Sequence, residues 1–157
     1  MFRTMGADVY KLEIRETDLW IYARLGADSV QHDEEHKCVE QIAERCRETG
    51  KNKVITERCV SDTISNVHGF RLAALLIDIF PPGTSVGVVD SDPVRRSHLE
   101  WGVRAHRAQP ISIKVFAATA DAEAWLTSLA AVSANMISQK AGQARLPANS
   151  NYGTHQP

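Results

Sequence analysis

The stretch Ser85-Val86-Gly87-Val88-Val89-Asp90-Ser91-Asp92-Pro93 decides the fold class of this 157-residue chain. Its first five residues form a short apolar run, which is typical of a strand buried on both faces. Asp92 and Pro93 then give a strong helix-start signal, because Asp caps the first turn and Pro fits the first helical position. A buried strand followed closely by a helix is the repeating unit of an α/β fold with parallel strands.

The alternation of strand and helix extends in both directions from this unit. Apolar residues recur at helical spacing in some segments and at every second position in others. Crossovers in such a series are right-handed, so the strands lie parallel and the helices cover the sheet. The elements predicted around the starting unit are a helix through 38–46, a strand at 53–59, a helix at about 67–80, a strand at 111–115 and a closing helix that Thr119 caps.

The chain opens with two alternating runs. In Tyr10-Lys11-Leu12-Glu13-Ile14-Arg15 apolar and charged residues alternate. In the next run, one face carries Leu19, Ile21, Ala23 and Leu25, and the opposite face carries Trp20, Tyr22 and Arg24. Residues 16–18 between them are too few for a crossover, so the runs pair as an antiparallel hairpin. The predicted fold class is therefore α/β, in the order ββαβαβαβα, with a mostly parallel sheet, an N-terminal antiparallel hairpin and covering helices.

Composition limits the classes of function. With 18 Lys and Arg against 19 Asp and Glu, the chain has a formal net charge of −1, which excludes a generally basic nucleic-acid binder. No apolar run is long enough to span a membrane, the start has no signal-peptide core, and the three cysteines lack CxxC spacing. We therefore expect a cytoplasmic protein with one domain over 1–132 and a polar, disordered tail over 133–157.

Two short motifs and the hairpin carry a family resemblance. Val54-Ile55-Thr56-Glu57-Arg58 ends in charged residues after an apolar start, and Val115-Phe116 is followed by Ala122-Glu123-Ala124-Trp125-Leu126. The first motif is similar to the central strand, and the second to the ending, of the SpoIIAA-like proteins. These proteins belong to the STAS superfamily of sulfate transporter and anti-sigma-factor antagonist domains. The resemblance runs from about Asp8 to Leu129, and it implies the same fold.

The resemblance also points to the start of the second helix. Anti-sigma-factor antagonists of this family carry Asp-Ser-Ser/Thr-Gly there, and a kinase phosphorylates the hydroxyl just before Gly. This chain reads Asn66-Val67-His68-Gly69, so His68 stands at the phosphoacceptor position. Ser65 is better placed to cap the helix by accepting a backbone N–H. The resemblance thus implies a non-enzymatic regulatory or ligand- and protein-binding domain that lacks the usual phosphoacceptor serine.

Residues in two segments could bind a ligand or a partner. Glu57 and Arg58 lie at the carboxyl end of their strand, which is the edge where open α/β folds bind ligands. A helix N-terminus binds anions, and His68 beside it could hold a phosphate or a carboxylate. The alternative is that these side chains only pair with neighbours and hold loops. The residues predicted to contact a protein partner, or a small anionic or lipid ligand, are Glu57, Arg58, Ser65, Asn66, His68 and Gly69.

Two other functions stay open. A carrier of a small molecule or lipid would need a pocket between the sheet and the second helix. His32-Asp33-Glu34-Glu35-His36 fits the H-x-x-E-H pattern of zinc peptidases, in which two imidazoles bind Zn²⁺ and a carboxylate activates water. The same five residues are also an acidic helix start with two incidental histidines. We expect no catalytic residue, no resident metal and no cofactor.

The second helix is apolar almost all round. From Phe70 to Phe80 the only charged residues are Arg71 and Asp78. Such a helix is covered either by a neighbouring helix or by a partner chain. We expect a two-fold homodimer, the commonest closed assembly. The residues predicted to contribute to its interface are Phe70, Leu72, Leu75, Leu76 and Ile79.

Overall fold

A computed structural model of the chain describes residues 10–106 and 109–129. The tail predicted over 133–157 lies outside these residues. The described part contains four helices and a five-stranded sheet in the order β1-β2-β3-β4-β5, which confirms the predicted α/β class. The elements are β1 Tyr10–Glu16, β2 Ile21–Ala27, α1 His32–Thr49, β3 Lys53–Val60, α2 Asn66–Ile79, β4 Ser85–Val89, α3 Pro93–Ala105, β5 Ser112–Phe116 and a closing helix over 119–129.

All five strands and helices α1 to α3 belong to one compact unit, Met1–Leu126. Of the second unit, Thr127–Pro157, the structure describes three residues, all of them helical. None of the helices in the described ranges is long and apolar enough to cross a membrane.

The hairpin forms as predicted, although its second strand starts later. β1 and β2 pair antiparallel from Tyr10 opposite Ala27 to Glu16 opposite Ile21. The Thr17 amide donates to the Trp20 carbonyl at 2.9 Å, and the Thr17 hydroxyl accepts from the Trp20 amide at 3.0 Å. These bonds close a turn that contains Leu19, whose side chain is 54% exposed. Leu19, predicted to be a strand residue that shares one face with Ile21, is therefore a turn residue.

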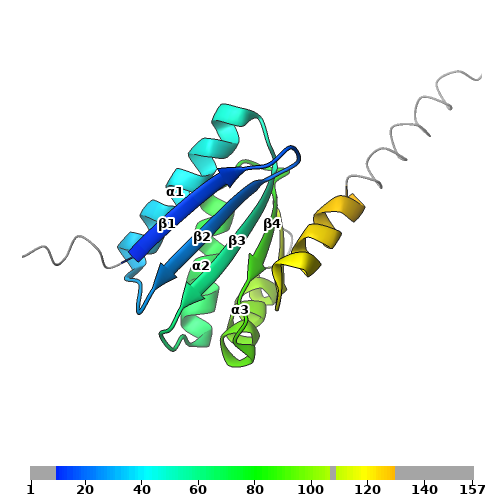
Figure 1. The fold of residues 1–157 in the computed structure, drawn as a ribbon. Coiled ribbons are helices and arrows are strands. Elements are labelled where there is room, and N and C mark those ends of the chain that lie inside the picture. The colour runs from blue at the N-terminus through cyan, green and yellow to red at the C-terminus, as the bar shows by residue number, and fades with distance from the viewer. Residues whose placement is uncertain (1–9, 107–108, 130–157) are drawn as a thin grey trace, which may run out of the picture. The chain divides into compact units, whose positions relative to one another are not determined.

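One face of the sheet is covered by α1, α2 and α3 (Figure 1). Strands β2 to β5 are parallel and follow one another across the sheet, so right-handed crossovers bring all three helices to the same side. The core between the two layers includes Ile21, Val54 and Val86 from the strands and Ile42 and Leu76 from the helices.

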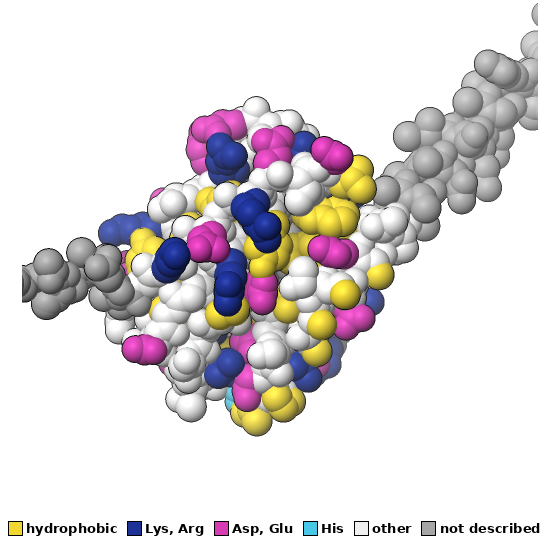
Figure 2. Space-filling model, viewed as in Figure 1, with side chains coloured by type: hydrophobic (Ala, Val, Ile, Leu, Met, Phe, Trp, Pro, Cys, Tyr) yellow, Lys and Arg dark blue, Asp and Glu magenta, His cyan; other side chains and the backbone are white. Residues whose placement is uncertain are grey.

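The opposite face of the sheet is covered only in part. Gly87 of β4 leaves room for the closing helix, since a Cβ there would lie 3.2 Å from the Ala122 side chain. Ala122 and Leu126 are fully buried, and the Phe116 ring packs on Trp125 with a centroid distance of 5.6 Å. Over the hairpin, by contrast, charged side chains of both signs are exposed (Figure 2).

Helices α2 and α3 touch through two glycines. A Cβ on Gly102 would lie 2.1 Å from the Gly69 carbonyl carbon, and a Cβ on Gly69 would lie 2.2 Å from the His98 carbonyl oxygen. Any side chain at either position would have to push one backbone away from the other. Gly69 therefore serves helix packing, and its contact with a ligand or partner stays a prediction.

The apolar surface of α2 is covered from within the chain. Leu72, Leu75 and Leu76 are exposed by only 8%, 7% and 3% because α1, α3 and the sheet pack around them. These three side chains therefore offer little surface to a dimer partner, and their place in an interface stays a prediction. Phe70 is 41% exposed and stacks on His106 at 4.2 Å, while Ile79 is half-buried, so for these two the interface stays a prediction.

Candidate functional site at the N-terminal ends of α1 and α2

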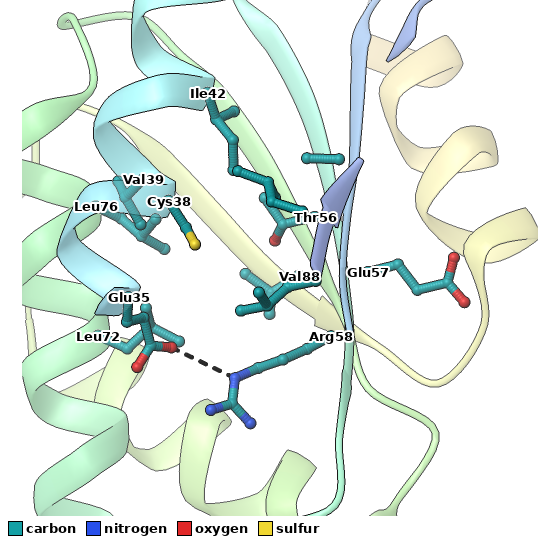
Figure 3. Close-up of a pocket in the computed structure, with 13 residues that line it drawn as sticks. Glu35, Cys38, Val39, Ile42, Thr56, Glu57, Arg58, Leu72, Leu76 and Val88 are labelled. Atoms are coloured by element: carbon teal, nitrogen blue, oxygen red, sulfur yellow. Dashed lines mark hydrogen bonds and ion pairs between the residues drawn. The ribbon is translucent and has the colours of Figure 1, made fainter. Parts of the chain in front are cut away.

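A buried charged cluster lies between β3 and the first turns of α1 and α2. The Arg58 side chain, 4% exposed, points from β3 towards Glu35 of α1 (Figure 3). Its Nε lies 3.4 Å from Glu35 Oε1, and its Nη1 lies 3.7 Å from Asp62 Oδ1. His68 of α2 completes the cluster, with Nε2 3.1 Å from Glu35 Oε2 and 3.5 Å from Arg58 Nη2. Glu35 thus pairs with a residue from each of two other elements.

The electrostatics of the cluster keep Glu35 ionised. Burial raises the pKa of this carboxyl, but the hydrogen bond to His68 and the charge of Arg58 outweigh burial and lower the pKa below its ordinary value. Arg58 lies within ion-pair distance of the carboxylates of both Glu35 and Asp62. Within the described ranges, Arg58 Nη1 and Asp62 Oδ1 form no hydrogen bond, and they interact only as an ion pair.

A cleft of about 300 Å³ opens beside this cluster. Both helix N-termini border the cleft, and each carries a partial positive charge from its unpaired amides. The Ser65 hydroxyl accepts the His68 amide at 3.3 Å, which confirms the predicted cap of α2. The polar lining residues besides Glu35 are Gln31, His32, Ser65, His68 and Arg71, and the apolar ones are Val30, Val67, Leu72 and Leu75. This mixture suits a small anion that carries a short apolar group.

A second cavity lies between the sheet and helices α1 and α2, on the other side of Glu35 (Figure 3). Its volume is about 40 Å³, and Leu12, Ile42 and Val88 are among its mostly apolar lining residues. This is the place where a lipid carrier would need its pocket. The volume lies far below the roughly 300–1,000 Å³ of ligand pockets, so the cavity as it stands holds no acyl chain.

Two of the six residues predicted to bind a ligand, Ser65 and His68, line the cleft. Arg58 does not line the cleft, but it contacts two of the lining residues, Glu35 and His68. Glu57 points to the opposite face of the sheet, because neighbouring residues of a strand alternate (Figure 3). Asn66 Oδ1 lies 2.6 Å from His98 Nδ1 and thus joins α2 to α3. Glu57, Asn66 and Gly69 do not line this cleft, and their contact with a ligand or partner stays a prediction.

Glu57 instead belongs to a polar group on the open face of the sheet. It accepts a hydrogen bond from the Tyr22 hydroxyl. Burial, together with this hydrogen bond and the Glu57 charge, raises the pKa of Tyr22 to about 12. Cys59 lies next to the pair, with Sγ 3.8 Å from Glu57 Oε1 and 3.5 Å from Arg24 Nε.

Sequence reasoning considered Glu35 only as the carboxylate of the H-x-x-E-H pattern, and it missed Asp62 and Arg71 as site residues. For Glu35 a signal existed, because it precedes Cys38, Val39 and Ile42 on the buried stripe of α1 by three, four and seven positions. A glutamate on such a stripe needs a buried partner of opposite charge, and Arg58 at the end of the predicted strand could have been proposed as this partner. Asp62 and Arg71 carry no comparable signal.

The two histidines of the H-x-x-E-H pattern have separate environments. His32 lines the cleft, whereas His36 Nδ1 pairs with Glu40 Oε1 at 3.3 Å on the same helix. Over 10–106 and 109–129, no three His, Cys, Asp or Glu side chains are arranged to hold a metal ion. Nothing in this part of the chain supports a zinc-dependent hydrolase.

No protein-family model matches the chain, and a search of curated proteins finds no match either. The resemblance to STAS domains therefore stands on the fold order and on the motifs quoted for it.

Proposed function

We propose that the chain is a non-enzymatic, STAS-like binding domain that holds a small anion in the cleft between α1 and α2. The observation that carries the proposal is the position of His68. This residue stands where anti-sigma-factor antagonists have their phosphoacceptor, and its ring pairs with the buried Glu35 at 3.1 Å. The position that carries the phosphorylated hydroxyl in the family is occupied here by His68, which lines the cleft.

The chemistry of the cleft favours an anion over a cation or a neutral ligand. Arg71 and His32 lie at its sides together with the N-termini of both helices. The one lining carboxylate, Glu35, is already paired with Arg58 and His68. Val67 and Leu75 add an apolar wall, so a ligand with an anionic head and a short alkyl group matches both kinds of surface.

A regulatory role through phosphorylation is not expected at this site. Ser65 is the nearest hydroxyl in the α2 start, and its oxygen accepts the His68 amide as the helix cap. A phosphoryl group on Ser65 would replace this cap by a bulky dianion beside Glu35. Incubation with a serine kinase of the anti-sigma type should therefore leave the intact mass of the protein unchanged.

A carrier function for a lipid is the second candidate, because the 40 Å³ apolar cavity lies where an acyl chain would enter. The cavity would have to widen by separation of α1 and α2 from the sheet. Native mass spectrometry of the protein from its own cells distinguishes the two functions. A retained lipid supports the carrier, and a bare chain or a small polar anion supports the binding domain.

Isothermal titration calorimetry with monobutyl phosphate, butyrate and butanol tests the anion site. We expect both anions to bind with dissociation constants of about 1 mM or tighter, and butanol not to bind. Arg71→Gln removes a charged hydrogen-bond donor from the cleft and should weaken anion binding by about tenfold. Arg104→Gln is the matched control, since Arg104 is exposed on α3 and absent from the cleft lining.

The outcomes separate cleanly. Anion binding that is weakened about tenfold in Arg71→Gln and unchanged in Arg104→Gln supports the proposed site. If neither anion binds, or if both variants bind as the unchanged protein does, the cleft is not an anion site and the proposed function fails.

A further inference from the structure

β1 forms one edge of the described sheet, with β2 as its neighbour there. The Thr17 amide bonds to the Trp20 carbonyl at the end of the hairpin, and the pairing alternates from that point. Lys11, Glu13 and Arg15 therefore direct their backbone N–H and C=O groups towards β2. Tyr10, Leu12 and Ile14 direct theirs outward. Such an edge is a template for pairing with a further strand.

The side chains of β1 differ sharply between the two faces. Tyr10, Leu12 and Ile14 lie on the helix side and are only half-buried, so apolar surface remains exposed at the edge. Lys11, Glu13 and Arg15 lie on the open face, where charges of both signs are visible in Figure 2. Lys11 Nζ lies 3.1 Å from Glu13 Oε1, and both side chains remain largely exposed.

We propose that β1 pairs antiparallel with β1 of a second copy, with Leu12 opposite the partner's Leu12 on a two-fold axis. In this register Tyr10 faces the partner's Ile14 on the helix side. Lys11 faces the partner's Glu13 on the open face, and the two-fold axis repeats this ion pair. The charged residues are then the closely spaced, non-hydrogen-bonded pairs, in which side chains interact most strongly. The sheet continues without a break through both copies.

The sequence of β1 disfavours the neighbouring registers. Centring the axis on Glu13 brings two glutamates together and sets Lys11 against the partner's Arg15, so all close pairs are like-charged. Centring it on Ile14 pairs Glu13 with the partner's Arg15 but sets Leu12 against the partner's Glu16. A register shifted by one residue places the apolar side chains of one copy beside the charged side chains of the other copy on each face of the sheet. Of the registers compared, the one with Leu12 on the axis combines charge and apolar complementarity.

The proposed dimer interface lies on β1, whereas the sequence predicted it on α2. Leu72, Leu75 and Leu76 of α2 are covered inside the chain, whereas the half-buried residues of β1 are not. The proposal is independent of the anion site, because neither Lys11 nor Glu13 lines the cleft between α1 and α2.

Sedimentation equilibrium of charge-swap variants tests both the surface and the register. The unchanged full chain should be a dimer at micromolar to submillimolar concentration. Lys11→Glu and Glu13→Lys each place like charges opposite one another twice, and each should weaken dimerisation by about tenfold or more. The double variant Lys11→Glu/Glu13→Lys restores opposite charges and should dimerise again. A mixture of the two single variants should form the heterodimer.

A backbone variant checks the edge pairing without changing charge. Leu12→Pro removes an N–H that points away from β2, so the chain should keep its circular dichroism spectrum and lose the dimer. A monomeric unchanged protein overturns the proposal, as does a dimer that all of these substitutions leave intact. A dimer that survives Lys11→Glu but is lost in both Glu13→Lys and the double variant has Ile14 on the axis, which overturns the stated register.

Discussion

Replacing Arg58 by Met tests whether the buried cluster holds the two helices to the sheet. The substitution keeps the length and the apolar stem of the side chain and removes its charge. Glu35 then remains buried with His68 as its only close partner of the cluster, because the 3.4 Å contact with the guanidinium is lost. Removal of one partner from a buried ion pair costs about 3–5 kcal/mol. Since His68 still bonds Glu35, we expect about 3 kcal/mol.

The assay is urea denaturation followed by circular dichroism at neutral pH. With a denaturant dependence of about 1–3 kcal/mol per molar for small proteins, the midpoint should fall by about 1–3 M. Arg45→Met is the matched control, because Arg45 pairs with Glu48 at 3.7 Å on the exposed face of α1. Loss of that pair should cost no more than about 0.5 kcal/mol. The double variant Glu35→Leu/Arg58→Met removes both charges and should recover most of the loss.

The pH dependence of Arg58→Met gives a second readout. In the unchanged protein the folded-state pKa of Glu35 is lowered, so its contribution to stability is present above the ordinary carboxyl pKa and is lost as pH falls through the folded value. Burial is already the largest single effect on this pKa, and without Arg58 only His68 opposes it, so we expect the pKa of Glu35 to rise. The cost of the substitution should then shrink as pH falls from neutral to mildly acidic. A loss as small as that of Arg45→Met, or one that is independent of pH, would refute this account of the cluster.

Two further predictions concern packing and burial. Gly102→Ala should lower the free energy of unfolding in urea by about 1–3 kcal/mol, because the added Cβ would lie 2.1 Å from the α2 backbone. Gly26→Ala is the control and should not destabilise the fold, because a Cβ added there has no atom within 4 Å. Burial raises the pKa of Cys38 and of Cys46 to about 11, so a thiol reagent at neutral pH should label only Cys59 in the folded chain and all three after denaturation. Equal losses of stability in Gly102→Ala and Gly26→Ala would contradict the packing prediction. Rapid labelling of all three thiols in the folded chain would contradict the burial prediction.

The order of elements could be predicted from the sequence because its signals are local. Asp92 accepts the Arg95 amide at 2.8 Å and starts α3 with Pro93 in the first turn, as the two residues alone suggest. Ser65 caps α2 in the same way. The hairpin could be predicted from two segments of alternating apolar and polar residues that are separated by a short gap. In each case the residues that decide the structure are within a few positions of one another.

The site needed information that is not local. Arg58 and Glu57 are adjacent in sequence, and only the face that β3 turns to the helices decides which of them joins Glu35 and His68. Those two partners are 23 residues before and 10 residues after Arg58. The packing of α3 on α2 also depends on a residue distant in sequence, because α3 can lie close to α2 only where Gly102 has no side chain. A pattern read along one helix could not separate cover by α3 from cover by a partner chain.

The most direct test of the binding function is a two-dimensional ¹H–¹⁵N NMR titration of the full chain with monobutyl phosphate. If the cleft between α1 and α2 holds the anion, the backbone amides of His32, Ser65 and His68 shift progressively and saturate. The amides of Lys11 and Glu13 on β1 stay in place. An unchanged spectrum, or shifts confined to residues outside the cleft, would contradict the proposed function.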